Sequence, residues 1–394
     1  MRNLALMATA AGTTIEKVDD FWPTIILAND RSLRGVDMRD RSLASLGSVV
    51  IVVAAVSLSP AAVTGQTPAS PAKGAPKTAP KTWTPPLTRD GHPDLQGVWL
   101  SNSATPLERP KGLEGKPFLT DAEVTELQKR ADRLFKDGKS DYAAGDSAFL
   151  AALSNLEVYK NPAGTTCDSL LMIEREFDNR TSLILDPADG RLPPLTSEAR
   201  QKQAERAEAR QRSPADGPED RNAIERCITP GVPRLGGNFG AGPYSYYQIV
   251  QTTGYVVLYM ETFHDARIIP LDRHPHLPES IRLWNGDPRG RWEGNTLVVD
   301  TTNFSPQSNF MGSAEGLHLV ERFTRVAPDT INYEITLNDP TTWTSSWTAV
   351  VRLKQTQDNL YEFACHEGNQ AMRGILAGAR AEEKAVEQAA GRPK

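Results

Sequence analysis

The sequence has little of several features that would each indicate a class of function. It carries 44 Lys and Arg against 49 Asp and Glu, a formal net charge of −5, and no basic stripe. This mildly acidic balance argues against nucleic acid as a partner. The glycine-rich residues 231–247 lack the Gly-Lys-Ser/Thr ending of a phosphate-binding loop, and no HExxH or other tight ligand spacing is present. Nucleic-acid binding, nucleotide binding and a helical zinc motif are therefore disfavoured.

The sequence also lacks an apolar run long enough to span a membrane. The apolar region from Leu43 to Leu58 is shorter than the ~20 residues that a spanning helix needs. Two arginines after Met38 precede it and the small residues Val63–Gly65 follow it, which is the order of a secretory signal peptide. We expect a signal peptide over residues 38–65, an over-extended gene start over residues 1–37, and export to the periplasm or the cell exterior. No membrane span would remain after cleavage. A membrane-anchored protein with a cytoplasmic N-terminal tail is the alternative.

Residues 66–86 are mostly Pro, Ala, Lys and Thr, with almost no large apolar groups. Such a segment cannot bury enough surface to offset its ordering entropy, so we expect a disordered linker. The remaining chain is long enough for one large domain or two small ones. Its patterns indicate a helical and irregular N-terminal portion over residues 87–230 and a β-rich portion over residues 231–394.

Only three cysteines are present, Cys167, Cys227 and Cys365. In an oxidising compartment they would form one disulfide and leave one thiol, and three pairings can be drawn. We favour Cys227 with Cys365, which ties the segment before the strands to the last predicted strand. A catalytic thiol is less favoured, because neighbours such as Cys365 and His366 point to opposite faces of a strand.

Two helices have clear local signals. Residues Thr120–Glu123 form a capping box, apolar residues follow at helical spacing as far as Leu134, and Gly138 suits the left-handed position that closes a helix. Residues Ser197–Arg212 predict a second helix with hardly any apolar stripe, which therefore lies on the surface. Both helices are expected to be structural.

From Tyr246 onwards, about eight short runs rich in Val, Ile, Tyr and Leu alternate with Gly, Pro, Asn and Asp. This pattern predicts a mainly β fold, an antiparallel and closed eight-stranded barrel. The last predicted strand is Leu360–His366, and residues 287–294 are interpreted as a turn-rich connection. A final helix over Ala371–Ala390 is expected to pack across one barrel opening. The side chains expected to make this contact are Met372, Ile375 and Leu376.

Histidine is scarce, yet five of the six lie in the predicted barrel. These are His264, His274, His276, His318 and His366. Our first hypothesis is a metal site, in which His264, His318 and His366 converge and Glu321 and Glu367 lie close by in the sequence. Three imidazoles with an open position would suit zinc or another first-row metal. The prolines around His274 and His276 indicate a loop there.

The second hypothesis is metal-free acid–base catalysis by the same histidines and glutamates. Histidine titrates near neutrality, and a neighbouring carboxylate such as Asp300 can orient it. Arg267 and Arg289 would hold an anionic part of the substrate. Strand alternation separates His264 from Asp265 and favours an ion pair between Asp265 and Arg267 on one face.

The third hypothesis is a binding module without catalysis. Tyr246, Trp284 and Trp292 would stack on a sugar ring or an apolar ligand, although buried tryptophans are more often core residues. The histidines would then be structural groups that hydrogen-bond to the backbone.

Several segments resemble an uncharacterised family of secreted bacterial proteins. They are DLQGVW (94–99), DPADGRLPPLT (186–196), HDARIIPLD (264–272), GDPRGRWEGNTLVVDTTNF (286–304), LHLVERFTRV (317–326) and CHEGN (365–369). The resemblance implies export and transfers no catalytic residues. A looser similarity to lipocalin-like barrels concerns the fold alone.

We therefore expect an exported protein with a barrel cavity for a small molecule. The first expectation is a lyase, isomerase or hydrolase that acts on a sugar-derived or aromatic compound. The alternative is a periplasmic ligand-binding or carrier protein. The sequence leaves the cofactor and the oligomeric state open.

Overall fold

The computed structural model describes residues 83–162, 174–233, 246–308 and 310–391. The chain divides into two compact units, Met1–Pro76 and Lys77–Lys394, and all described residues belong to the second unit. The expected signal peptide, Cys167 and most of the expected linker lie outside the described residues. Within the described part of the chain, no helix has the length and apolar character required to cross a bilayer.

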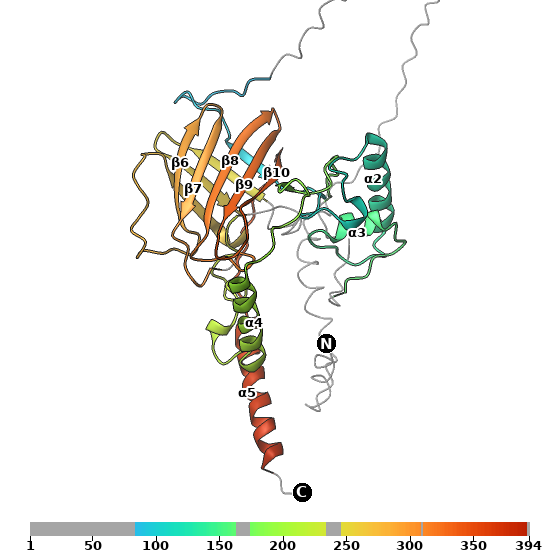
Figure 1. Ribbon diagram of the computed structural model, residues 1–394, viewed down its shortest axis with the longest axis vertical. Helices are drawn as coiled ribbons and strands as arrows, with labels where there is room; N and C mark the ends of the chain where they lie inside the picture. Colours follow the sequence, from blue (N-terminus) through green and yellow to red (C-terminus); the bar gives the residue numbers. More distant parts are fainter. Residues whose placement is uncertain (1–82, 163–173, 234–245, 309, 392–394) are drawn as a thin grey trace, which may run out of the picture. The chain divides into compact units, whose positions relative to one another are not determined.

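The centre of the fold is one ten-stranded antiparallel sheet (Figure 1). Its order is β5-β4-β3-β1-β10-β9-β8-β7-β6, and β2 pairs with β10 outside this path. The strands are β1 (Gly97–Leu100), β2 (Ile184–Asp186), β3 (Tyr246–Gln251), β4 (Tyr255–Met260), β5 (Asp265–Pro270), β6 (Asp287–Glu293), β7 (Thr296–Thr302), β8 (His318–Ala327), β9 (Thr330–Asn338) and β10 (Trp347–Thr356). The mainly antiparallel β prediction is confirmed.

The closed barrel is not confirmed, because the ladder is open between β5 and β6. These two end strands nevertheless approach each other. A Cβ added to Gly290 of β6 would lie 2.7 Å from Ile269 Cγ2 and 2.7 Å from Leu271 Cδ2. The absence of a side chain at Gly290 is therefore what lets the two strands come this close.

Alternation of side chains gives the sheet a buried inner face and a partly exposed outer face. On β8, Leu319, Glu321 and Phe323 are buried, whereas the residues between them are half-buried. Trp99 of β1 and Trp347 of β10 are fully buried in the same apolar core. The inner face is thus the main core of the protein.

The N-terminal portion contributes two strands to this sheet. β1 lies between β3 and β10 and pairs with both, so it joins the two runs of strands that follow it in the sequence. β2 pairs with one end of β10. The sheet is therefore built from both portions of the chain.

Helix α2 (Asp121–Phe135) begins with the expected capping box between Thr120 and Glu123, and Gly138 adopts a φ of +71° just beyond its end. Its apolar side, including Leu127, packs on α3 (Ser147–Leu153). These predictions are confirmed, and the capping box supplies partners for backbone N–H groups that the first turn leaves unpaired.

Two further helices have no buried residues, α4 (Ser197–Arg212) and α5 (Ala371–Ala390). The surface position of α4 is confirmed. The three apolar residues of α5 that were expected to cover a barrel opening are only half-buried. Arg380 of α5 instead donates to the backbone oxygens of Asp216 at 2.9 Å and Ala215 at 3.3 Å.

Three local predictions need correction. Leu360–His366 forms no strand, and Asp287–Glu293 is strand β6 rather than a turn. His264 lies in a short 3-10 turn, Thr262–His264, where Phe263 and His264 have φ values of +61° and +51°, so it is not on a strand. The favoured disulfide between Cys227 and Cys365 is present.

Candidate functional site

A buried ion pair joins β5 and β8 on the inner face of the sheet. Arg267 Nη1 donates to Glu321 Oε1 at 2.9 Å, and Arg267 Nη2 donates to Glu321 Oε2 at 2.6 Å. The two side chains are 5% and 0% exposed. Thr301 Oγ1 accepts from Arg267 at 3.3 Å, and the Tyr333 hydroxyl donates to Glu321 Oε1 at 2.5 Å. A charge pair that is buried away from water needs such hydrogen bonds to offset its lost hydration.

Burial and the neighbouring charge act on the groups of this pair. Burial opposes the charge on Arg267, but the Glu321 carboxylate outweighs burial and raises the pKa of the guanidinium. Burial raises the pKa of Tyr333 well above its ordinary value, and Glu321 adds to this effect. Arg267 is therefore engaged by Glu321 rather than free to hold a substrate anion. Asp265, its expected partner, instead accepts from Asn285 Nδ2 at 2.6 Å.

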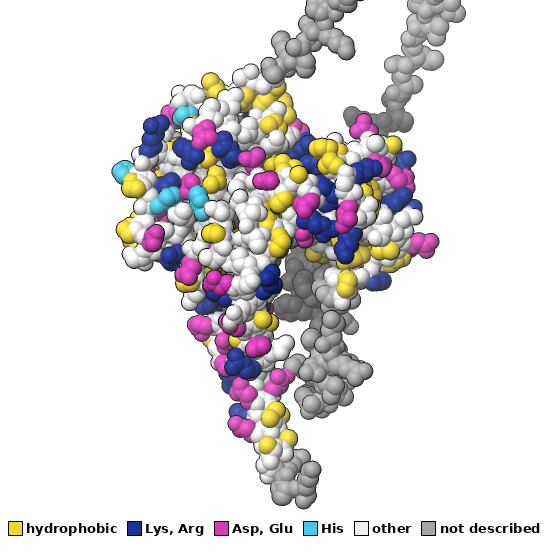
Figure 2. All heavy atoms as spheres, viewed as in Figure 1, with side chains coloured by type: hydrophobic (Ala, Val, Ile, Leu, Met, Phe, Trp, Pro, Cys, Tyr) yellow, Lys and Arg dark blue, Asp and Glu magenta, His cyan; other side chains and the backbone are white. Residues whose placement is uncertain are grey.

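The outer face of β6, β7 and β8 carries a second polar group, which we call the histidine–aspartate cluster. Its members are Asp287, His276, Asp300 and His318. His276 Nδ1 lies 3.0 Å from Asp287 Oδ2, and His276 Nε2 lies 3.0 Å from Asp300 Oδ1. His318 Nε2 lies 3.0 Å from Asp300 Oδ2. In Figure 2, histidine side chains lie at several places on the visible face, some of them close together.

Asp287, the most buried member of this cluster, is held from two more directions. Leu277 N donates to its Oδ2 at 2.9 Å, and Arg289 Nη1 lies 2.8 Å from its Oδ1. Arg289, an expected anion-binding residue, is thus paired inside the protein. Asp300 was expected as a carboxylate that could orient a histidine, but nothing in the sequence indicated that His276 would contact it.

Charge partners shift two pKa values in the cluster. The hydrogen bond with Asp300 raises the pKa of His318, although partial burial opposes this. Burial would raise the pKa of Asp300, but the hydrogen bonds from His318 and His276 outweigh it and lower this pKa. The cluster is therefore an alternation of carboxylates and imidazoles in which negative charge on Asp300 is favoured.

The other expected catalytic residues lie elsewhere. His264 Nε2 is 3.9 Å from Glu362 Oε1 beside the 3-10 turn. His366 and Glu367 are exposed in the turn that follows Cys365. Glu321 points to the inner face, whereas His318 lies on the outer face of the same strand. The expected histidines and glutamates thus lie in different parts of the fold and do not form one site. Among the described residues, no three His, Cys, Asp or Glu side chains are arranged to hold a metal ion.

Two expected aromatic contacts also serve other roles. The Tyr246 hydroxyl donates to Asp358 Oδ2 at 3.3 Å. Trp292 packs against the inner core and stacks on His92, with ring centroids 4.9 Å apart.

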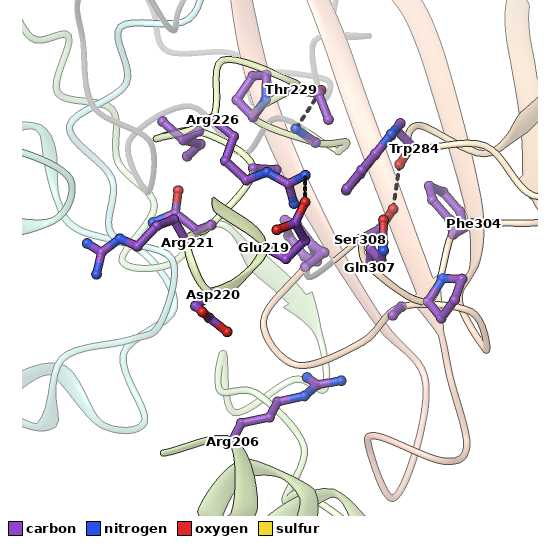
Figure 3. Close-up of a pocket in the computed structure, with 18 of the residues that line it drawn as sticks. Arg206, Glu219, Asp220, Arg221, Arg226, Thr229, Trp284, Phe304, Gln307 and Ser308 are labelled. Carbon is purple, nitrogen blue, oxygen red and sulfur yellow. Dashed lines mark hydrogen bonds and ion pairs between the residues drawn. The ribbon is translucent and has the colours of Figure 1, made fainter. Parts of the chain in front are cut away.

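A cavity of about 540 Å³ lies between α4, residues 219–232 and the segment 304–317. Trp284, which the sequence indicated as a binding residue, lines this cavity together with Phe304, Phe310 and Leu317. Figure 3 shows Trp284 and Arg226 directed towards each other from opposite sides. The cavity therefore has an apolar wall that faces a polar one.

Arginine dominates the charged lining. It includes Arg206, Arg210, Arg212, Arg221 and Arg226, with Glu219 and Asp220 as the acids. Arg221 is held by Glu225 at 2.8 Å and points away from the cavity in Figure 3. Arg226 lies 3.8 Å from Glu219, a looser contact than a hydrogen-bonded pair, so its guanidinium keeps donors for another acceptor.

A polar network supports the cavity wall. Thr229 Oγ1 lies 3.0 Å from Asp265 Oδ2 and 3.0 Å from Asn285 Oδ1, which share its single proton, and Ser308 Oγ donates to Trp284 O at 2.7 Å. Sequence reasoning missed Arg226 and Phe304, because they lie on loops without periodicity. The only sequence signal near Arg226 was Cys227, whose disulfide fixes the loop that carries Arg226.

Comparisons with protein-family models, with curated proteins and with solved structures find no match for this chain.

Proposed function

We propose that this protein binds a small anionic molecule with an aromatic or apolar body in the cavity beside Trp284, as an exported carrier without catalysis. The observation that supports this proposal most is the composition of the lining. Arginines face aromatic side chains across the space, and no histidine is among the described residues that line it. Guanidinium groups recognise carboxylate and phosphate, and the aromatic wall suits a flat apolar body.

The size of the cavity agrees with this function. Small-molecule sites are typically about 300–1,000 Å³, mostly apolar, with a few placed polar groups. The cavity has about 540 Å³ and combines Trp284, Phe304 and Phe310 with Arg206 and Arg226. Between the two expectations from sequence, this arrangement favours the carrier over the enzyme.

Export is part of the same proposal. The disulfide between Cys227 and Cys365 suits an oxidising compartment. We also propose that residues 38–65 are a signal peptide and that the chain belongs to the secreted family it resembles. The same proposal includes closure of the sheet as in lipocalin-like barrels.

An enzyme is the second candidate, and the histidine–aspartate cluster is the observation in its favour. His318 is 43% exposed and hydrogen-bonds to Asp300, as a general acid or base held by a carboxylate would. Hydrolysis, elimination or isomerisation of a small molecule would use this pair.

The carrier proposal is tested by isothermal titration calorimetry with a panel of aromatic carboxylates and aryl phosphates. For the ligand that binds, Arg226→Gln should weaken affinity by roughly 10-fold or more, because it removes a charge-assisted hydrogen bond. Trp284→Leu should weaken binding through the lost stacking surface. The matched control is Arg291→Gln, since Arg291 is exposed on β6 and pairs with Glu293. Equal affinity in wild type, Arg226→Gln and Trp284→Leu would contradict the proposal, as would a panel without any binder.

A further inference from the structure

We propose that His276 acts as a pH-dependent clasp for the loop 271–286. As an imidazolium, it holds this loop to β6 and β7 through Asp287 and Asp300. As the pH rises and the ring loses its proton, the loop becomes less firmly held. The loop connects β5 to β6 and carries Trp284 into the cavity wall. The clasp would therefore regulate the site of the proposed function, and only this consequence for ligand binding rests on that function.

The geometry of the ring carries the inference. Nδ1 of His276 faces Asp287 Oδ2 and Nε2 faces Asp300 Oδ1, each at 3.0 Å. A neutral imidazole donates from one nitrogen and has a lone pair on the other, which would meet a carboxylate oxygen unfavourably. Only the imidazolium donates from both. Both contacts together therefore require the protonated ring.

The two acceptors each have a further donor or cation beside them. Asp287 accepts from Leu277 N and lies beside the Arg289 guanidinium. Asp300 accepts from His318 as well as from His276. Both oxygens that face His276 are therefore acceptors that a doubly donating ring would satisfy.

Among the described residues, the charged groups around His276 come from three strands and from its own loop. Asp287 and Arg289 come from β6, Asp300 from β7 and His318 from β8, and His274 in the same loop is turned to Asp272 at 2.7 Å. With both rings protonated, Arg289 and the two imidazolium groups outnumber the two carboxylates by one charge. Loss of the ring protons leaves two carboxylates and one cation, so the neutral His276 ring keeps at most one of its two hydrogen bonds and loses the charge attraction.

The loop links this clasp to the cavity wall through the backbone. Leu277 and Pro278 oxygens accept from Asn303 Nδ2 at 2.8 and 3.3 Å, directly after His276. Leu283 N donates to Asn303 O at 2.9 Å, directly before Trp284. Asn303 therefore connects the clasped half of the loop to the half that reaches the cavity.

The test is amide hydrogen exchange, followed by mass spectrometry, of peptides that cover residues 271–286 at pH 6 and pH 8.5. The full chain is compared with His276→Gln and with the matched control His274→Gln, an exposed histidine of the same loop. We expect wild type to exchange roughly 10-fold more slowly than His276→Gln at pH 6, because a hydrogen bond between charged groups is lost. At pH 8.5, above the range in which histidine titrates, the two should exchange alike. His274→Gln should follow wild type at both values.

Several outcomes overturn the clasp. A difference that persists at pH 8.5 shows that the neutral ring suffices, and no difference at pH 6 shows that the ring fastens nothing. Slow exchange that depends on added zinc and is lost with a chelator would mean neutral, metal-bound imidazoles. If His276→Gln does not fold, Asp300→Asn is compared instead. Exchange that behaves as expected without any ligand in the calorimetry panel would refute the carrier proposal alone.

Discussion

The buried pair of Arg267 and Glu321 gives the sharpest test of what holds the sheet together. Arg267→Met removes the guanidinium and leaves the Glu321 carboxylate at 0% exposure, with the Tyr333 hydroxyl as its remaining side-chain donor. Breaking a buried pair from one side costs about 3–5 kcal/mol, because an uncompensated charge stays in the core. We expect a free energy of unfolding lower by that amount.

The double substitution Arg267→Met with Glu321→Leu should cost less than Arg267→Met alone. It removes both charges and fills the space with apolar atoms, and such replacements of buried pairs are often near neutral. The assay is urea unfolding of the disulfide-intact protein, followed by circular dichroism. A loss of about 3–5 kcal/mol corresponds to a fall in the midpoint of roughly 1–3 M.

The control is Arg291→Met, which breaks the exposed pair with Glu293, where the two side chains are 47% and 40% exposed. Surface pairs contribute about 0–1 kcal/mol, so this change should barely move the midpoint. If Arg267→Met moved it as little as Arg291→Met does, the reasoning from burial would be refuted. A double variant as unstable as the sum of its two single variants would refute the account of charge compensation.

Two further predictions concern other parts of the chain. Burial raises the pKa of Asp146 from 3.8 to about 6, so the folded state binds this proton more tightly than the unfolded chain, and stability falls as the pH rises from about 4 to about 6. Asp146→Asn should therefore be more stable than wild type at pH 7 by up to about 3 kcal/mol. Urea unfolding of both proteins at pH 4 and pH 7 measures this difference in stability. An equally large difference at pH 4 would contradict the prediction. Replacing Cys227 and Cys365 by Ser should lower the free energy of unfolding by about 2–5 kcal/mol, because the disulfide links residues 138 positions apart. Thermal unfolding of this variant and of the oxidised wild type measures the loss. An unchanged transition temperature would contradict the prediction.

Much of the sheet was predictable because local patterns agree with the tertiary structure. Strands β8 and β9 are two of the short apolar runs predicted after Tyr246. The helices α4 and α5 have the expected bounds. In each case, periodicity, turn residues or caps all indicate the same element.

The failures lie where tertiary contacts override local preference. β6 contains Pro288 and Gly290, which are poor strand formers, but its pairing with β7 and the close approach to β5 hold it extended. Leu360–His366 has the composition of a strand, yet β10 before it already pairs with β1, β2 and β9. The residue pattern of a segment does not show whether the neighbouring strands already have both edges paired.

The candidate sites were less predictable than the fold. Trp284 was expected to bind a ligand and does line the cavity, but Arg226 reaches it from a loop without any periodic signal. His276 was assigned to a loop, which is right, yet its two carboxylate partners are set by how that loop folds back on β6 and β7. When loops bring residues together, the residues have no regular spacing in the sequence from which their contact could be predicted.

The central place of β1 also constrains the order in which the chain can fold. Trp99 is fully buried, and its strand partners are Tyr247 on one side and Gln355 on the other. At a synthesis rate of ~5–20 residues per second, Gln355 follows Trp99 by on the order of tens of seconds. Until then β1 has no second neighbour, and the runs β3–β5 and β6–β10 stay unjoined. Pairing between such distant segments is slow, so completion of the sheet waits for one of the last strands made rather than for any local hairpin.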